Sequence, residues 1–264
     1  MDLQLSGKRA LISGSTAGIG FAIATELARE GVKIVINGRR PQQVADAVER
    51  LRHLVSGAEV DGVAADLATA EGVAALIAGC PQADILVNNL GIFDPVPFEA
   101  IPDSEWQRFF EINVMSGVRL SRHYLPAMKA ANWGRIVFIS SESGINPPTE
   151  MLHYGMTKAA QLSISRGLAQ TTTGTGVTVN AVLPGPTRSD GVAEFFGKLA
   201  AEQGITQAAM EQRFFADARP TSILKRLIEP AEVAALVIYL CSARASATNG
   251  AALRVEGGVV SSMC

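Results

Sequence analysis

The sequence predicts an α/β protein built around one seven-stranded, doubly wound parallel sheet. Short apolar runs alternate with helical patterns along the chain, and no linker, repeat or low-complexity tract divides it. Because helices separate the strands, hairpins cannot join them, so the sheet is parallel and covered on both faces. The 264 residues, 48% of them hydrophobic, are enough for one large core, and we expect residues 1–264 to form a single domain.

Seven segments have the β-branched, apolar character of strands. They are residues 9–13, 33–37, 60–66, 84–89, 135–141, 177–183 and 252–256. Between them, residues 19–30 and 231–241 place apolar side chains on one helical face.

Residues 188–226 depart from this alternation. They follow the sixth strand and carry apolar side chains at near-helical spacing, namely Val192, Phe195, Phe196, Leu199, Met210, Phe214 and Phe215. Ligands of open α/β sheets bind beyond the carboxyl ends of the strands, where this insertion begins. We therefore expect a helical substrate lid, with a helical pair that patches the core or an interface as the alternative.

Composition favours a small-molecule partner. The chain has 23 basic and 25 acidic side chains and no basic cluster, which argues against nucleic acid as a partner. No apolar run reaches the length of a membrane span and no signal-peptide pattern precedes the first strand, so we expect a cytoplasmic protein without a membrane partner. Cysteines (Cys80, Cys241, Cys264) and histidines (His53, His123, His153) are scattered, so we expect neither disulfides nor a catalytic metal.

A glycine-rich turn joins the first strand to the first helix. Gly14, Gly18 and Gly20 stand in the spacing G-x-x-x-G-x-G, with Ser15, Thr16 and Ile19 among the residues between them. Glycines let the backbone approach a pyrophosphate, whose charge the helix N-terminus then stabilises. We expect these six residues to bind a dinucleotide, although such a turn can also serve only to reverse the chain.

The end of the second strand favours NADP(H) over NAD(H). Arg39 and Arg40 follow it directly, and no carboxylate is present there to bind a ribose 2′-hydroxyl. A guanidinium pairs with a 2′-phosphate, so both arginines are candidate cofactor ligands. The alternative is that they are merely solvated, and this alternative is stronger for Arg40.

Tyr154 and Lys158 are the candidate catalytic pair. Their i, i+4 spacing places both side chains on one face of a helix. A phenol with a pKa near ~10 is a poor catalyst at neutral pH, and we expect the nearby ammonium to lower this pKa. Such pairs also occur on ordinary amphipathic helices, so this match alone does not identify a site.

Ser141 is expected at the cofactor edge of the sheet, where the fifth strand ends. Its hydroxyl could donate a hydrogen bond to a substrate carbonyl. A turn-capping role is the alternative, and Ser140 and Ser143 are competing candidates.

These motifs, in this order, resemble the short-chain dehydrogenase/reductase family, from the first strand nearly to the C-terminus. The resemblance implies a Rossmann-type fold in which Asp66, followed by Leu67, contacts adenine. Asn88, Asn89, Leu90 and Gly91 occupy the family's Asn-Asn-Ala-Gly segment, which makes Asn89 and Gly91 cofactor residues and leaves Asn88 as a strand-end support. Leu90 departs from that pattern, and its bulk is expected to affect packing beneath the cofactor turn.

The same resemblance implies a catalytic tetrad of Asn113, Ser141, Tyr154 and Lys158. In it, Asn113 orders a proton-relay water and Lys158 also holds the nicotinamide ribose. Pro184, Gly185 and Thr187 would lie against the carboxamide. Tyr154 and Lys158 thus count both as catalytic and as cofactor-binding residues.

The predicted function is NADP(H)-dependent interconversion of a ketone, including 3-oxoacyl substrates, and a secondary alcohol, with Tyr154 as proton donor and acceptor. Sugar, polyol or steroid-like alcohols are alternative substrates, and a non-catalytic NADP(H)-binding sensor or scaffold is the alternative function. The C-terminal segment 249–258 resembles the family's last strand, which commonly lies at a subunit interface. The resemblance therefore implies a homotetramer, with a dimer as the alternative.

Overall fold

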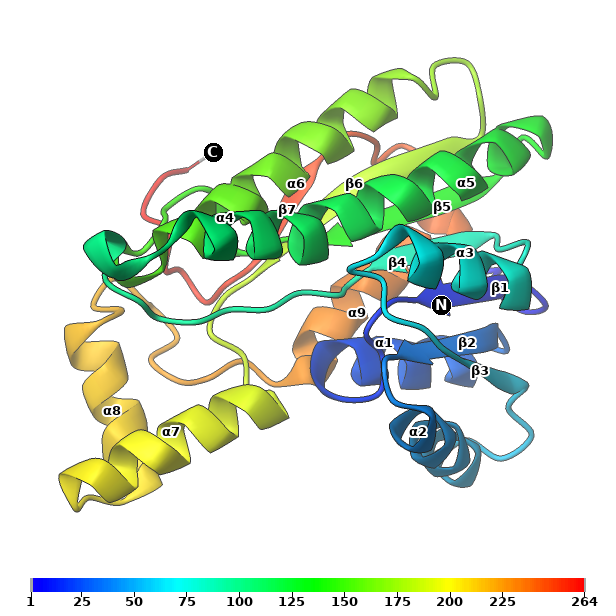
Figure 1. The fold of residues 1–264 in the computed structure, drawn as a ribbon. Helices are drawn as coiled ribbons and strands as arrows, with labels where there is room; N and C mark the ends of the chain where they lie inside the picture. Colours follow the sequence, from blue (N-terminus) through cyan, green and yellow to red (C-terminus); the bar gives the residue numbers. More distant parts are fainter. Residues whose placement is uncertain (1, 264) are drawn as a thin grey trace.

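A computed structural model, which describes residues 2–263, confirms the doubly wound fold (Figure 1). Its seven strands are all parallel and lie in the order β3-β2-β1-β4-β5-β6-β7. The strands are β1 (Arg9–Ile12), β2 (Lys33–Gly38), β3 (Val60–Ala64), β4 (Ile85–Asn88), β5 (Gly134–Ile139), β6 (Val177–Pro184) and β7 (Ala252–Val255). Each predicted strand overlaps one of them, with boundaries that differ by two residues at most.

Helices cover both faces of the sheet (Figure 1). They are α1 (Gly18–Arg29), α2 (Pro41–Leu54), α3 (Ala70–Gly79), α4 (Asp103–Phe110), α5 (Ser116–Ala130), α6 (Leu152–Gln170), α7 (Asp190–Gln203), α8 (Gln207–Asp217) and α9 (Pro230–Cys241). Successive strand residues point to opposite faces, so Ala10 and Ile12 pack with α1, α2 and α9, whereas Leu11 packs with α3, α5 and α6. The two apolar layers sandwich the sheet.

The strand order reverses at β1, which pairs with β2 on one side and with β4 on the other. In a doubly wound sheet the connections on the two sides of such a point diverge and leave a crevice at the carboxyl ends of the strands. The loops after β1 and β4 therefore meet where the sequence predicts the cofactor.

The segment 188–226 forms the predicted pair of helices, α7 and α8. Side chains of Ser189 and Thr206 cap their N-termini, and Gly204 ends α7 with a left-handed φ of 64°. The pair has a small apolar core of its own, in which Phe196, Phe215 and Leu227 are buried. The side chain of Phe195 lies outside the part of the chain that the structure describes.

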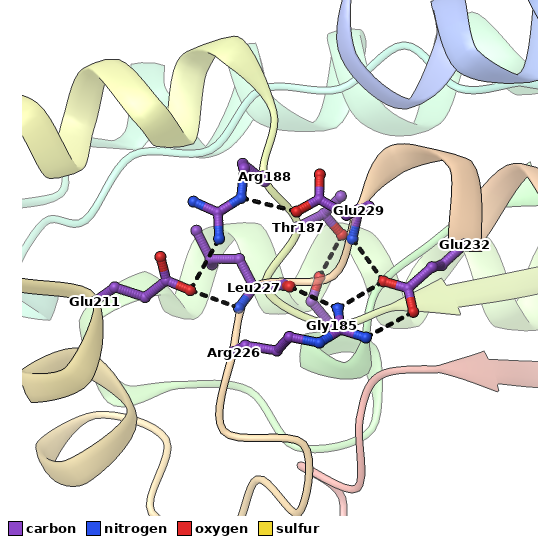
Figure 2. Close-up of polar contacts among 8 residues, drawn as sticks. All are labelled: Gly185, Thr187, Arg188, Glu211, Arg226, Leu227, Glu229 and Glu232. Atoms are coloured by element: carbon purple, nitrogen blue, oxygen red, sulfur yellow. Dashed lines mark hydrogen bonds and ion pairs between the residues drawn. The ribbon is translucent and has the colours of Figure 1, made fainter. Parts of the chain in front are cut away.

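The two ends of this segment are tied together (Figure 2). Arg188, at its start, pairs with Glu229 (Nε–Oε1, 2.9 Å) and with Glu211 of α8 (Nη2–Oε1, 3.1 Å). Glu211 also accepts a 2.9 Å hydrogen bond from the backbone N–H of Leu227, at the far end. The helical pair is thus an insertion whose entry and exit are joined by ion pairs.

A second set of hydrogen bonds holds the exit of the segment to the end of the chain. The backbone N–H groups of Ile223 and Leu224 both donate to the carbonyl oxygen of Gly257, at 2.8 and 2.9 Å. The Thr221 hydroxyl donates to the carbonyl oxygen of Val259 at 2.6 Å. Residues 257–259 therefore fix the position of residues 221–224.

Cys80 and Cys241 are buried free thiols, and Cys264 lies outside the described residues. Within residues 2–263, no group of three or more His, Cys, Asp or Glu side chains is arranged to hold a metal ion. No helix in the same range has both the length and the apolar character needed to cross a bilayer.

Candidate active site

The glycine-rich turn is shaped by backbone conformation and close packing. Gly14 and Gly18 have left-handed φ values of 61° and 56°. At Gly20 an added Cβ would lie 2.5 Å from Asn89 Nδ2 and 2.7 Å from the Gly14 carbonyl oxygen. Only glycine at position 20 allows α1 to start this close to the turn, which leaves the N-terminal N–H groups of α1 facing the crevice.

Other predicted residues support the turn from beneath. The Ser15 hydroxyl is buried, donates to the Ile12 carbonyl at 2.7 Å and accepts from the Asn37 N–H at 3.0 Å. Asn89 Nδ2 donates to the carbonyl oxygens of Ser13 and Gly14, each at 3.0 Å. The side chains of Ser15 and Asn89 therefore hold the turn to its neighbouring strands.

Leu90 packs directly against the turn. A Cβ built on Gly14 would meet Leu90 Cα at 3.1 Å and Leu90 Cδ1 at 3.3 Å. The Leu90 N–H donates to the Ser13 hydroxyl at 3.0 Å, so the loop after β4 keeps its contact with β1. The bulk of Leu90 is accommodated because Gly14 has no side chain.

The charged residues that we expect to contact the adenosine part of a cofactor lie just beyond the ends of β2 and β3. Arg39 and Arg40 are exposed between β2 and α2, and Asp66 is exposed beyond the end of β3, next to the buried Leu67. Arg50 of α2 is not among the residues that sequence motifs predict. Its Nη2 donates to the Thr16 carbonyl at 3.2 Å and its guanidinium lies 3.6 Å from the centre of the Phe21 ring.

Lys158 is buried on α6 beside the end of β5. Its Nζ donates a 2.9 Å hydrogen bond to the Ile139 carbonyl and lies 5.4 Å from the centre of the Tyr154 ring. Burial lowers the pKa of Lys158 to about 8, although the charge of Glu142 opposes this shift. The structure therefore brings Tyr154 and Lys158 together on one helix face.

The expected lowering of the Tyr154 pKa is wrong for this structure. Desolvation raises the pKa of the Tyr154 phenol, and the nearby Glu142 carboxylate raises it further. A hydrogen bond with Ser141 and the charge of Arg219 offset part of this shift. Desolvation is the largest of these effects, and the ammonium of Lys158 donates its hydrogen bond to the Ile139 carbonyl.

Ser141 lies beyond the strand that was expected to contain it. β5 ends at Ile139, and the Ser141 hydroxyl caps a short 3₁₀ turn, Glu142–Gly144, by accepting from the Ser143 N–H at 3.1 Å. The same hydroxyl donates to the Glu142 carboxylate. Ser140 is not equivalent, because its hydroxyl donates to the Lys158 carbonyl at 2.8 Å.

Asn113 lies in a π-helical turn, Glu111–Met115, between α4 and α5. Its buried side-chain amide accepts from the Ile92 N–H at 2.8 Å and donates to the Ile92 carbonyl and to the Thr157 hydroxyl, each at 3.0 Å. Gln161 donates to the Asn113 carbonyl at 2.6 Å. Asn113 thus joins the loop after β4 to α6, and Ile92, Thr157 and Gln161 are partners that no local motif predicts.

Three of the candidate catalytic residues border a cavity of about 440 Å³. Ser141, Tyr154 and Lys158 line it with Gly91, Pro184, Gly185 and Thr187. Opposite them stand apolar side chains of α7 and α8, namely Val192, Phe196, Leu199, Met210 and Phe214. Glu142, Glu150 and Arg219 add charge, and sequence motifs predict none of the three.

His153, which precedes Tyr154, is 1% exposed and belongs to α6. Its ring centroid lies 3.9 Å from that of Phe109 and 6.0 Å from that of Trp106, both on α4. His153 therefore packs α6 against α4 and is not among the residues that line the cavity.

Comparisons with known proteins agree with this geometry. The family described as short chain dehydrogenase matches residues 8–199. The uncharacterized oxidoreductase YvaG of Bacillus subtilis is 51% identical over 263 residues, covering 100% of both chains, and D-beta-hydroxybutyrate dehydrogenase of Cupriavidus necator is 31% identical, covering 97% of this chain and 99% of its own. Among solved structures, L-sorbose reductase from Gluconobacter frateurii, complexed with NADPH and L-sorbose, superposes with a TM-score of 0.94 at 33% identity over 100% of both chains.

Proposed function

The chain belongs to the short-chain dehydrogenase family and is an oxidoreductase that acts on CH–OH and C=O groups, and from this we propose that it is an NADP(H)-dependent ketone reductase. The observation that carries the proposal is the meeting of three groups, the Ser141 hydroxyl, the Tyr154 phenol and the Lys158 ammonium, in the wall of one cavity. A ketone oxygen accepts hydrogen bonds and gains a proton on reduction, and these groups can supply both.

The residues of the crevice fit a phosphorylated dinucleotide. Glycines 14, 18 and 20 leave room for a pyrophosphate at the N-terminus of α1. Arg39 and Arg40 offer guanidinium groups to a 2′-phosphate, and we add Arg50 to them because it lies against the Thr16 carbonyl. Asp66, Leu67, Asn89 and Gly91 would complete the adenosine side, and Pro184, Gly185 and Thr187 the nicotinamide side. When bound, the cofactor supplies the hydride.

Tyr154 acts as the proton donor in the direction of reduction. The phenol is protonated at neutral pH, so its proton is present for donation, but its raised pKa also makes it a weaker acid. Ser141 donates a second hydrogen bond to the ketone oxygen, and Lys158 places a positive charge beside the phenol as the proton leaves. Asn113 holds the loop at Ile92 against α6 and so fixes the position of the helix that carries Tyr154 and Lys158.

The substrate is a ketone with both polar and apolar parts, because the cavity combines aromatic and aliphatic side chains with Glu142, Glu150 and Arg219. The 188–226 segment serves as a lid over it within a single domain. L-sorbose, the sugar in the complex with L-sorbose reductase, and 3-oxoacyl compounds represent the two chemical classes to compare. We further propose that the protein is a homotetramer, which light scattering of the purified protein would test. We also propose a cytoplasmic location.

The test follows NADPH and NADH consumption by the purified protein with L-sorbose, ethyl 3-oxobutanoate, a 3-oxoacyl thioester and a steroid ketone. Turnover of at least one ketone, faster with NADPH than with NADH and lost in Tyr154→Phe, is expected. Tight NADPH binding without turnover of any ketone would instead favour a sensor or scaffold.

A further inference from the structure

The residue that follows Ser141 is a buried carboxylate. Glu142 is 5% exposed and lines the same cavity as Tyr154. Burying an unpaired carboxylate is costly, so its partners decide what it does there. It is reached by the hydroxyl of Ser141 and by the guanidinium of Arg219.

The hydroxyl of Ser141 has one hydrogen to give. Its oxygen already accepts from the Ser143 N–H at 3.1 Å, its hydrogen is donated to Glu142, and the Tyr154 phenol also lies within hydrogen-bonding reach of it. A ketone oxygen can only accept hydrogen bonds, so it competes with Glu142 for the same hydrogen. An ionised carboxylate is the stronger acceptor and would keep it. A protonated Glu142 would donate to Ser141 instead and leave the serine hydrogen free for the ketone.

The charges around Glu142 come from several elements. Arg219, beyond the end of α8, has its Nε 3.8 Å from Oε1 of Glu142, and its Nη1 lies 3.2 Å from Oε1 of Glu150. Tyr154 and Lys158 face Glu142 from α6. β6, which also touches the Glu142–Gly144 turn, has no titratable side chain.

The surroundings of Glu142 shift its pKa in opposite directions. Burial raises the pKa of Glu142, whereas the hydrogen bond from Ser141, the charge of Arg219 and hydrogen bonds from the backbone and side chain of Ser143 lower it. Arg219 is divided between two carboxylates, Glu142 and Glu150, which weakens its hold on either one. Burial therefore favours the protonated form of Glu142, and its polar and charged neighbours favour the carboxylate.

We propose that Glu142 is a positioning residue that, in its protonated form, donates to Ser141 and so directs the serine hydroxyl to the ketone, while Arg219 opposes this by stabilising the carboxylate. This inference rests on the proposed function. The proton stays on Glu142 throughout, so no additional reactant is needed.

The experiment measures the pH profile of kcat for NADPH-dependent reduction of the best ketone of the panel in four proteins. In the wild type, kcat falls about tenfold per pH unit above the ionisation of Glu142. Glu142→Gln, whose amide remains a donor at all pH values, lacks this break, while the later decline due to Lys158 remains. Arg219→Gln moves the break to higher pH, and the matched variant Glu150→Gln moves it to lower pH because Arg219 then pairs with Glu142 alone.

Three results would overturn the inference: an unchanged break in Glu142→Gln, a loss of kcat in that variant at every pH, or a change in KM alone. Arg219→Gln and Glu150→Gln retain Glu142 and provide the test if Glu142→Gln does not fold. Full turnover by Tyr154→Phe would refute the proposed function. If Tyr154→Phe is inactive but the pH profile of kcat in Glu142→Gln keeps the wild-type break, only this inference is refuted.

A second readout does not depend on turnover. Nuclear magnetic resonance of protein labelled with ¹³C at the glutamate carboxyl carbons follows Glu142, whose signal is identified by its loss in Glu142→Gln. The titration midpoint is expected above the ordinary glutamate value of 4.5 and higher still in Arg219→Gln. A midpoint at or below 4.5 would contradict the inference, since burial would then not favour the protonated form of Glu142.

Discussion

The ammonium group of Lys158 donates a 2.9 Å hydrogen bond to the carbonyl oxygen of Ile139, the last residue of β5. The end of a central strand thus holds a buried cation in the cavity wall. Burying the charge has a cost, which is expressed in the lowered pKa of Lys158, about 8.

Lys158→Met should change how stability depends on pH. The pKa of Lys158 is about 8 in the folded protein and ~10.4 in an unfolded chain, so between these values the unfolded state binds more protons. The wild type should therefore gain about 3 kcal/mol relative to Lys158→Met as pH rises through this window. Urea unfolding of both proteins at pH 7 and pH 10 measures the difference, and parallel pH dependences would contradict the prediction.

Tyr154→Phe should remove the proton donor and little else. We expect kcat to fall by about 10²- to 10⁴-fold, the usual contribution of general acid catalysis, while the Kd for NADPH stays the same. Steady-state kinetics and a fluorescence titration with NADPH give the two values. A variant that keeps wild-type kcat would exclude Tyr154 as the donor.

Arg39→Gln should weaken NADPH selectively. Loss of one hydrogen bond to a charged phosphate costs about 1.5–3 kcal/mol, which corresponds to a rise of roughly 10- to 100-fold in the KM for NADPH. The KM for NADH should not change, because NADH has no 2′-phosphate. Arg40→Gln, at the neighbouring exposed position, tests the second proposed phosphate ligand in the same way. Equal effects of Arg39→Gln on both cofactors would show that Arg39 does not bind the 2′-phosphate.

Gly20→Ala should disturb the cofactor turn. The new Cβ would lie 2.5 Å from Asn89 Nδ2, so Asn89 must shift away from the Ser13 and Gly14 carbonyls. We expect a loss of about 1–3 kcal/mol of stability and weaker NADPH binding. Gly167→Ala in α6 is the control, because nothing lies within 4 Å of its added Cβ, and it should stabilise the protein by up to about 1 kcal/mol. Similar losses in both variants would contradict this account.

Local sequence patterns predicted the strands and the candidate catalytic pair, Tyr154 and Lys158, because both depend on short-range spacing. Alternation of apolar runs with helical patterns locates all seven strands, and the i, i+4 spacing brings Tyr154 and Lys158 together. Contacts between distant residues have no such pattern. Arg219 and Glu150 are 69 residues apart, and Arg50 is 34 residues from Thr16.

Local sequence patterns also could not predict the pKa values of the residues in the site. The sequence places an ammonium near the Tyr154 phenol, but the desolvation that raises its pKa depends on how the whole cavity is closed. The π-helical turn at Asn113 is equally hidden, because the residues of 111–115 fit an ordinary helix. Burial of His153 against α4 depends on the angle at which that helix crosses α6.

The hydrogen bonds from Ile223 and Leu224 to Gly257 bear on the biosynthesis of the protein. A ribosome makes the wall of the cavity well before it makes the residues that anchor that wall. Until residues 257–259 have been made, residues 221–224 lack these hydrogen-bond partners. A growing chain can therefore assemble the glycine-rich turn early, but the exit of the 188–226 segment is anchored only after residues 257–259 have left the ribosome.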